Sequence, residues 1–222
     1  PVAHIAHIFD LAERFDCDAD FHIDFDLDPE NSDLPVLIAA TEARGWGGRV
    51  VAGHASKLSA MAPMDVAAMT ARLRDAGIGV VALPATDLFL MGREADRLQP
   101  RGVAPLATMH KAGVRCAVAS NNILNPFTPY GDANLVRMAN LFANVANLST
   151  DEDLRTCFAM ISGDAAAMIG LPHSLAVGAP ATMVLLAAPN PAMAVRTLAE
   201  ARMGWIHGRP TFDRPPPQLH TR

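Results

Sequence analysis

Charged residues, cysteines and long apolar runs are all scarce in this sequence of 222 residues, and each scarcity excludes a class of protein. Only 18% of the residues are charged, and no basic stripe accompanies the net charge of −5, so we expect no nucleic-acid binding. No apolar run reaches 18 residues and no signal peptide is visible, so we expect no membrane span. The chain opens on Pro1 inside a helical pattern, which favours a fragment or a processed chain.

The cysteines are few and widely separated. Cys17, Cys116 and Cys157 are odd in number and lack the short spacing of a thiolate zinc site, which argues against a disulfide framework as well. Free thiols fit a reducing compartment best. We therefore expect a cytoplasmic protein.

Half of the residues are hydrophobic, and short apolar segments alternate four times with helical ones. The sequence predicts helices over residues 2–15, 32–44, 65–75, 103–111, 134–147 and 151–170, and strands over 21–25, 49–54, 79–83 and 114–119. These strands lack period-2 alternation, which is typical of strands buried on both faces of a parallel sheet. A doubly wound sheet and half of a (β/α)8 barrel both satisfy the pattern. No G-x-G-x-x-G follows a strand, so we expect no dinucleotide site.

The character of the chain changes after Pro172. Short β segments with turn residues between them are expected at 175–178, 182–187 and 205–209. We therefore divide the chain into an α/β part, residues 1–172, and a C-terminal β part, residues 173–222.

Polar side chains gather where the four predicted parallel strands end, which is where a barrel carries its functional groups. They are His22 and Asp24, His54, Thr86 and Asp87, and Ser120, Asn121 and Asn122. Two histidines at adjacent strand ends can converge on one pocket, and neutral imidazole is the commonest metal ligand, so a zinc or iron site is a candidate. Structural histidines, a solvated acidic loop and a turn cap at Asp87 are the alternative interpretations.

The residues at these strand ends resemble those of the cytosine deaminases in the amidohydrolase superfamily. Leu11-Ala-Glu-Arg-Phe-Asp followed by Asp20-Phe-His-Ile-Asp is similar to the helix before the fifth barrel strand and to that strand. Further similar segments follow in the same order at residues 47–56, 90–93, 100–103, 125–131 and 177–186. The resemblance implies an α/β fold: residues 1–172 as the C-terminal half of a (β/α)8 TIM-type barrel, strands 5–8, and residues 173–222 as strands of a small flanking β-sandwich.

The same resemblance implies a metal-dependent hydrolase that acts on a non-peptide C–N bond of a cyclic amidine or amide. A divalent ion, zinc or iron, would activate the attacking water. The substrate would be a small nitrogen heterocycle. We expect this fragment alone to be inactive, because the H-x-H pair that supplies metal ligands in the family is missing from these 222 residues.

Position by position, the implied site is only partly standard. His22 matches the fifth-strand metal ligand, and His54 matches the sixth-strand histidine that orients water and substrate. Asn121 falls on the metal aspartate, whereas Phe25 falls on the glutamate that shuttles protons, a loss that commonly costs about 10²–10⁴ in rate. Asp24, one position earlier, is the candidate to replace that glutamate.

Two further residues complete the implied site, and the replacements in it keep a second function open. Asn122 and Phe127 match positions that face the substrate. Because Phe25 and Asn121 remove chemistry while keeping packing volume, the alternative is a catalytically impaired homologue that acts as a binding or partner subunit. A sheet of four βα units leaves two open edges, which predicts a homo-oligomer or pairing with an N-terminal half.

Overall fold

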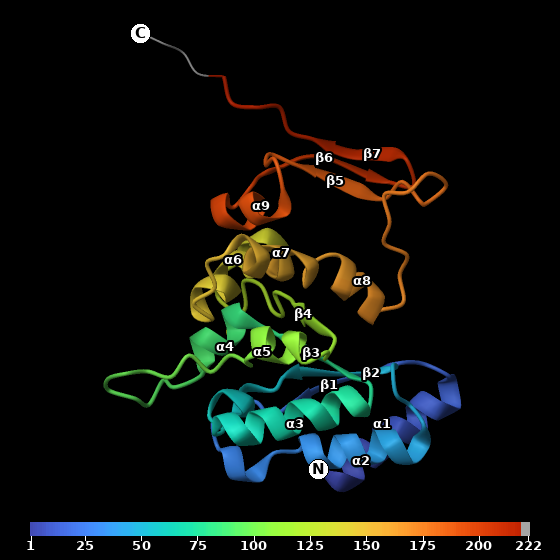
Figure 1. The fold of residues 1–222 in the computed structure, drawn as a ribbon, viewed down its shortest axis with the longest axis vertical. Coiled ribbons are helices and arrows are strands. Elements are labelled where there is room, and N and C mark those ends of the chain that lie inside the picture. Colours follow the sequence, from blue (N-terminus) through green and yellow to red (C-terminus); the bar gives the residue numbers. More distant parts are fainter. Residues whose placement is uncertain (219–222) are drawn as a thin grey trace.

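The computed structural model describes residues 1–218, which form a parallel sheet with helices and a smaller antiparallel sheet (Figure 1). The strands are β1 (Ala19–Ile23), β2 (Val50–His54), β3 (Ile78–Ala82), β4 (Cys116–Val118), β5 (Met183–Leu186), β6 (Ala201–Ile206) and β7 (Arg209–Asp213). The α-helices are α1 (Val2–Phe15), α2 (Leu34–Arg44), α3 (Pro63–Asp75), α4 (Pro84–Leu90), α5 (Leu106–Lys111), α6 (Leu135–Val145), α7 (Asp151–Ala159), α8 (Gly163–Met168) and α9 (Pro191–Thr197). Two short 3-10 helices are η1 (Pro29–Asn31) and η2 (Ser56–Ser59).

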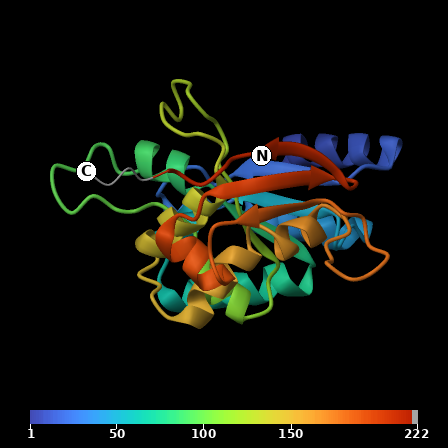
Figure 2. The same cartoon turned by 90° about the horizontal axis from the view of Figure 1, so that it is seen from above.

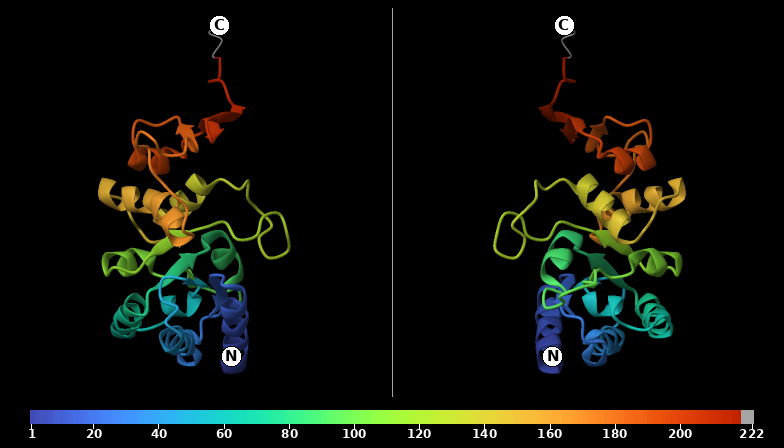
Figure 3. Two further views of the ribbon diagram at one scale, coloured as in Figure 1. Left: turned by 90° about the vertical axis from the view of Figure 1, so that its right-hand side faces the viewer. Right: turned by 90° about the vertical axis from the view of Figure 1, so that its left-hand side faces the viewer.

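The first sheet is parallel throughout, with its strands in the order β1-β2-β3-β4. Its register places Phe21 beside Ala52, and Val80 beside both Ala52 and Cys116. All four side chains are buried and belong to the main hydrophobic core. Helices α2, α3 and α5 lie together on one side of this sheet (Figure 3). The α/β alternation expected from the sequence is therefore confirmed.

Burial on both faces was expected for these strands, and for β1 that expectation is wrong. β1 alternates, with Ala19 and Phe21 buried and with Asp20 and His22 exposed. β1 lies at the edge of the sheet, and the side chains of Asp20 and His22 on its second face are exposed. His22 therefore borders an open surface, whereas His54 on β2 is buried.

Helix α4 follows β3 directly, where the sequence predicted only the end of a strand at Pro84. Proline is favoured in the first turn of a helix, because its missing N–H would be unsatisfied there anyway. Pro84 takes that position, and the carboxylate of Asp87 accepts a hydrogen bond from the Leu83 backbone N–H at 3.2 Å. The same proline thus ends β3 and starts the helix that brings Thr86 and Asp87 to the sheet.

The second sheet is antiparallel, in the order β5-β6-β7, and α9 lies between β5 and β6 in the chain. The strand expected over 182–187 is confirmed as β5, whereas the segment expected over 205–209 spans the turn at His207 and Gly208 that joins β6 to β7. The strand expected over 175–178 is wrong. That segment is an exposed turn, and Gly178 has a φ of 90° that a strand does not accommodate. Helix α9 packs on α7, and Arg196 pairs there with Asp151 at 2.8 Å.

The loop after β4, residues 119–134, projects away from the sheet (Figures 2 and 3). It carries Asn121, Asn122 and Phe127. Within residues 1–218, no helix has both the length and the apolar character needed to cross a bilayer. The three cysteines are free thiols, with Cys17 exposed and Cys116 and Cys157 buried.

Candidate functional site

Three of the four parallel strands lead into a non-glycine residue with left-handed backbone. The φ angle is 54° at Asp24, 67° at His54 and 58° at Asn121, which follow or end β1, β2 and β4 respectively. Asp, Asn and His adopt this region more readily than other side chains, but it still costs free energy and persists where the surroundings hold it. Eight further non-glycine residues within residues 1–218 have a positive φ as well, so the angle alone does not mark a site. What these three residues share is their place at the carboxyl edge of the sheet, where parallel strands carry functional groups.

The partner of His54 follows β3, the one strand of the four that does not lead into such a residue. Asp87, in the first turn of α4, lies 2.7 Å from the Nδ1 atom of His54, and both side chains are almost wholly buried. Burial raises the pKa of the Asp87 carboxyl, against the lowering effect of its hydrogen bond to His54. A carboxylate at Nδ1 favours the tautomer with the proton on that nitrogen and leaves Nε2 as the second ring atom for chemistry.

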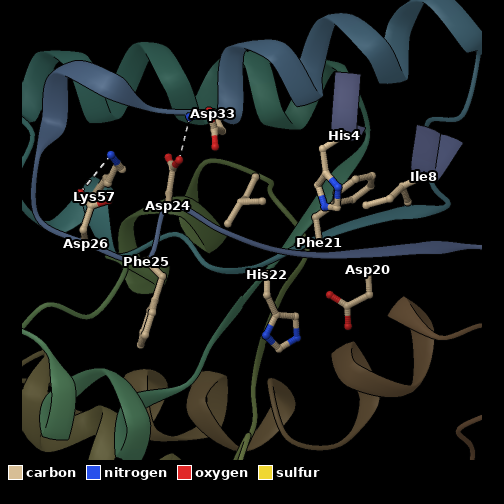
Figure 4. Close-up of a pocket in the computed structure, with 11 residues that line it drawn as sticks. His4, Ile8, Asp20, Phe21, His22, Asp24, Phe25, Asp26, Asp33 and Lys57 are labelled. Carbon is tan, nitrogen blue, oxygen red and sulfur yellow. Dashed lines mark hydrogen bonds and ion pairs between the residues drawn. The ribbon is translucent and has the colours of Figure 1, made fainter. Parts of the chain in front are cut away.

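His22 and Phe25 surround the His54 ring. The His22 and His54 ring centroids lie 5.1 Å apart in an edge-to-face arrangement, and the Phe25 ring lies 4.1 Å from His54. Phe25 and His22 extend to the same side of β1 (Figure 4). His22 is exposed, and its side chain makes no hydrogen bond within residues 1–218. The structure therefore brings His22, His54 and Phe25 together, as the sequence predicted.

Asp24 points the other way, toward Asp33 and Lys57 (Figure 4). Its carboxylate accepts hydrogen bonds from the Ser32 hydroxyl at 2.5 Å and from the Asp33 N–H at 2.7 Å. Burial raises the pKa of Asp24, while these donors and Lys57 lower it. The carboxylate proposed as a proton shuttle is thus held on the side of β1 opposite to His22.

Lys57 ties the loop between β1 and α2 to the end of β2. Its buried ammonium group lies 3.0 Å from the Asp26 carboxylate and donates to the Asn31 carbonyl oxygen at 3.1 Å. Its backbone N–H donates to the Asp24 carbonyl oxygen at 3.3 Å. Phe25 lies between these two anchored aspartates. These contacts of Lys57, called the Lys57 clamp below, hold both sequence neighbours of Phe25 in place, and the Phe25 ring then lies against His54.

Asn121 reaches the first turn of α4 from the other direction. Its Nδ2 atom donates to the Thr86 hydroxyl at 3.3 Å, and that hydroxyl is hydrogen-bonded to the hydroxyl of Thr128. Thr86 and Thr128 are both buried. Asn121, the predicted metal ligand, is consequently held by a series of hydrogen bonds that joins the loop after β4 to α4.

The two residues predicted to contact substrate lie in the projecting loop. Asn122 is half-buried, and Phe127 is exposed in a turn whose backbone N–H groups bond the Asn125 side chain. Among the described aromatic contacts, Phe127 meets neither His22 nor His54. The structure does not bring this residue to the histidines.

The sequence identified Thr86 and Asp87 as candidate strand-end residues, with a turn cap as the alternative for Asp87, and it gave no signal for Lys57 or Thr128. Asp87 directly follows β3, and β3 is the neighbour of β2, which ends at His54. This adjacency could have predicted that Asp87 and His54 lie together. Thr128 is 42 residues from Thr86 in the chain, and local pattern does not report such a contact.

A hollow of about 620 Å³ runs along the unpaired edge of β1. Side chains from both faces of the strand line it, including His4 and Asp24 on one side and Asp20 and His22 on the other (Figure 4). Within residues 1–218, no group of three or more His, Cys, Asp or Glu side chains is arranged to hold a metal ion. The described residues therefore offer part of a ligand set.

Known proteins similar to this chain include a deaminase and an amidohydrolase. The chain is 35% identical over 174 residues to a pterin deaminase of Rhizobium rhizogenes, covering 77% of this chain and 39% of that protein. It is 26% identical over 190 residues to an N-isopropylammelide isopropyl amidohydrolase of a Pseudomonas species, covering 84% and 44%. These relatives do not favour the alternative of an impaired partner subunit.

The fold is similar to that of a solved enzyme as well. The crystal structure of 5-methylcytosine deaminase from Klebsiella pneumoniae with 5-fluorocytosine matches with a TM-score of 0.94 and 26% identity, over 99% of this chain and 54% of that one. The chain thus spans about half the length of the relatives it matches, or less. The model of the amidohydrolase family matches residues 1–212. The chain is a cytosine-deaminase-like member of the amidohydrolase family.

Proposed function

We propose that the protein hydrolyses an exocyclic C–N bond of a nitrogen heterocycle, a deamination, through a water molecule activated by a divalent metal ion. The observation that carries this proposal is the cluster of His22 with the buried His54–Asp87 pair, at the carboxyl ends of neighbouring parallel strands. The two deaminases and the amidohydrolase named above support the substrate class.

The described residues fit a divalent ion as part of its ligand set. His22 presents an exposed imidazole whose ring nitrogens make no hydrogen bond within residues 1–218, so either nitrogen is free to bind a metal ion. Asn121 would add a neutral oxygen ligand, and the remaining donors would come from outside the described residues. Zinc or iron fits imidazole ligands, and when bound such an ion lowers the pKa of water into the neutral range.

The chain's own residues then divide the work. His54 is held by Asp87 through Nδ1, so that Nε2 stays aimed away from the carboxylate and can accept or return a proton. The Asp87 carboxylate stabilises the protonated ring electrostatically, because the pair lies out of water. Phe25 covers one side of His54 and excludes solvent from it. Asn122 and Phe127 would meet the heterocycle from the loop after β4.

We further propose that residues 1–172 are the C-terminal half of a (β/α)8 barrel, strands 5–8, and that residues 173–218 belong to a small flanking β-sandwich. The last residues of the expected C-terminal part, 219–222, lie outside the described residues. The parallel order of β1 to β4 with two unpaired edges supports the first part. The exposed antiparallel sheet β5–β7 supports the second. Open parallel edges invite pairing with an N-terminal half or a second copy. The free thiols fit a cytoplasmic protein.

The test is to measure metal content and ammonia release in the intact protein against a panel of aminopyrimidines, pterins and triazines. The His22→Ala variant is expected to lose most of its bound metal and its activity. The His7→Ala variant, which changes an exposed histidine on α1, is the matched control and is expected to keep both. An intact protein that binds no divalent metal and turns over no heterocycle contradicts the proposal.

A further inference from the structure

Two adjacent side chains in the first turn of α4 reach two different strand ends. Asp87 holds His54 at the end of β2, and Thr86 holds Asn121 beyond the end of β4. Both side chains are essentially buried, with 0% and 1% of their surface exposed. Because β3 lies between β2 and β4, the helix that follows β3 is placed to connect its two neighbours. One helical turn therefore organises both sides of the candidate site.

The Thr86 hydroxyl has the hydrogen-bonding capacity for this task. A hydroxyl donates one hydrogen bond and accepts two, whereas the amide nitrogen of Asn only donates. Thr86 Oγ1 therefore accepts from Asn121 Nδ2, and its own proton is available for Thr128 Oγ1. The planar amide then turns Asn121 Oδ1 away from Thr86. No hydrogen bond to that oxygen occurs within residues 1–218.

The contacts of Thr86 differ from those of other buried helical threonines in this chain. Thr41 and Thr70 are equally buried, and each donates its hydroxyl to the carbonyl oxygen four residues earlier in its own helix. That local bond is the default for a threonine inside a helix. Thr86 instead bonds side chains from a different loop, 35 and 42 residues away. The Thr86 hydroxyl therefore joins α4 to the loop after β4, and it does not bond the backbone of its own helix.

We propose that Thr86, supported by Thr128, is a positioning residue that orients the Asn121 amide so that Oδ1 serves the metal site. The inference rests on the function proposed above, and it explains how a neutral side chain occupies a position where the family carries an aspartate. An amide oxygen is a weak ligand, so its orientation matters more than that of a carboxylate with two equivalent oxygens. Fixing the amide in advance removes the entropy of ordering it on binding.

The experiment compares three variants of the intact protein by chelator competition for zinc. Thr86→Val keeps the shape and removes the hydroxyl, and it is expected to weaken zinc binding by about 10–100-fold, as loss of a group supporting a ligand commonly does. Thr86→Ser restores the hydroxyl and is expected to remain within about twofold of the natural protein. Thr70→Val removes an equally buried hydroxyl that bonds only within α3, and it is the matched control for lost stability.

Two outcomes of the zinc measurement overturn the proposal. One is zinc affinity in Thr86→Val equal to that of the natural protein. The other is an equal loss in Thr70→Val, which would make the effect one of general stability. If Thr86→Val does not fold, Thr128→Val replaces it, with a weaker loss of affinity expected and an unchanged affinity counting against the proposal.

A crystal structure of the metal-free variants separates this proposal from the proposed function. In Thr86→Val the Asn121 amide is expected to reorient, whereas in Thr86→Ser it keeps the natural orientation. Reorientation in an intact protein that neither binds zinc nor deaminates heterocycles would support the positioning role and refute the function. An Asn121 amide unmoved in Thr86→Val overturns the positioning role whatever the activity.

Discussion

The ends of β1 and β3 each carry a buried aspartate, and the two differ in what surrounds them. Asp24 is met by the Ser32 hydroxyl, the Asp33 N–H and the charge of Lys57, all of which keep it in place on its own loop. Asp87 is met by His54. Burial raises the pKa of both carboxyls. The same residue type at the same edge of the sheet is thus used once to build a loop and once to hold an imidazole.

The difference teaches that burial and a raised pKa do not by themselves mark a catalytic carboxylate. A partner that can change its protonation state during a reaction does. His54 is such a partner, because imidazole is the side chain that most often serves as general acid or base, whereas the Ser32 hydroxyl and the Asp33 N–H only donate hydrogen bonds to Asp24. We therefore expect the carboxylate of Asp87 to act in the reaction and that of Asp24 to support its loop, while His22 on β1 stays the predicted metal ligand.

The largest expected effect follows from replacing Asp87. The Asp87→Asn variant is expected to lower kcat about 100-fold, because the neutral amide no longer stabilises the protonated His54 ring and meets the Leu83 N–H with its own donor. Steady-state kinetics of ammonia release measure this loss. The pH profile of kcat is expected to change as well, which a purely structural role would not produce.

A second His–Asp pair provides the control for Asp87. Asp164 on α8 lies 3.1 Å from His110 on α5, in a half-buried pair. Asp164→Asn is expected to leave kcat within about twofold, because a half-exposed ion pair contributes about 0–1 kcal/mol. Equal losses in the two variants would show that the His54–Asp87 pair has no special role in the reaction.

Replacing Lys57 is expected to affect stability and not chemistry. In Lys57→Met the ammonium group no longer bonds Asp26 and Asn31, and Asp24 remains buried without that charge. Hydrogen bonds to charged groups contribute about 1.5–3 kcal/mol, so we expect a loss of about 2 kcal/mol in the free energy of unfolding. Urea denaturation measures it.

The control for Lys57 is an exposed lysine. Lys111→Met removes a contact of 3.7 Å to Asp153 from a side chain that is 72% exposed, and it is expected to change stability by less than about 0.5 kcal/mol. If Lys57→Met instead abolished zinc binding without loss of stability, Asp24 and its loop would belong to the site, and the contrast between the two aspartates would fail.

The sequence was a good guide where the pattern is local. The helix predicted over residues 2–15 is α1, because its apolar residues repeat on one face, and left-handed Gly45 ends α2 as its position suggested. His22 and His54 were placed together correctly, because parallel strands end at one edge. Helix α9 was missed, since its seven residues lie between short apolar segments that favour strands as readily.

The remainder of the site depends on contacts that no local pattern reports. Asp24 was a reasonable shuttle by its neighbourhood in sequence, but a left-handed φ turns its carboxylate to the far side of β1. The role of Thr86 depends on Asn121 and Thr128, in a loop that the chain reaches only after α5 and β4. Such roles follow from packing between distant segments, which one sequence without its structure does not determine.

A smaller effect is expected at Phe25, the residue that the Lys57 clamp places on His54. Phe25→Ala removes a ring 4.1 Å from the imidazole, and we expect kcat/KM to fall about fivefold as water gains access to His54. Phe15→Ala, at an exposed position on α1, is the control and should leave kcat/KM unchanged. A larger kcat/KM in Phe25→Ala would indicate that the ring blocks the substrate.

The smallest effect tests the sign of the pKa shift at Asp24. Because burial raises this pKa above 3.8, the folded state binds a proton more tightly than the unfolded state between 3.8 and the raised value. The contribution of Asp24 to the stability of the folded state is therefore largest at acid pH, and it is lost as the pH rises through that window. Asp24→Asn does not titrate, so the stability of the natural protein relative to this variant is expected to fall from pH 4 upward in urea titrations. A relative stability that rises with pH would mean that the donors Ser32, Asp33 and Lys57 outweigh burial. Asp24 would then be a carboxylate stabilised in its charged form. It would differ from Asp87 both in its pKa and in its hydrogen-bond partners.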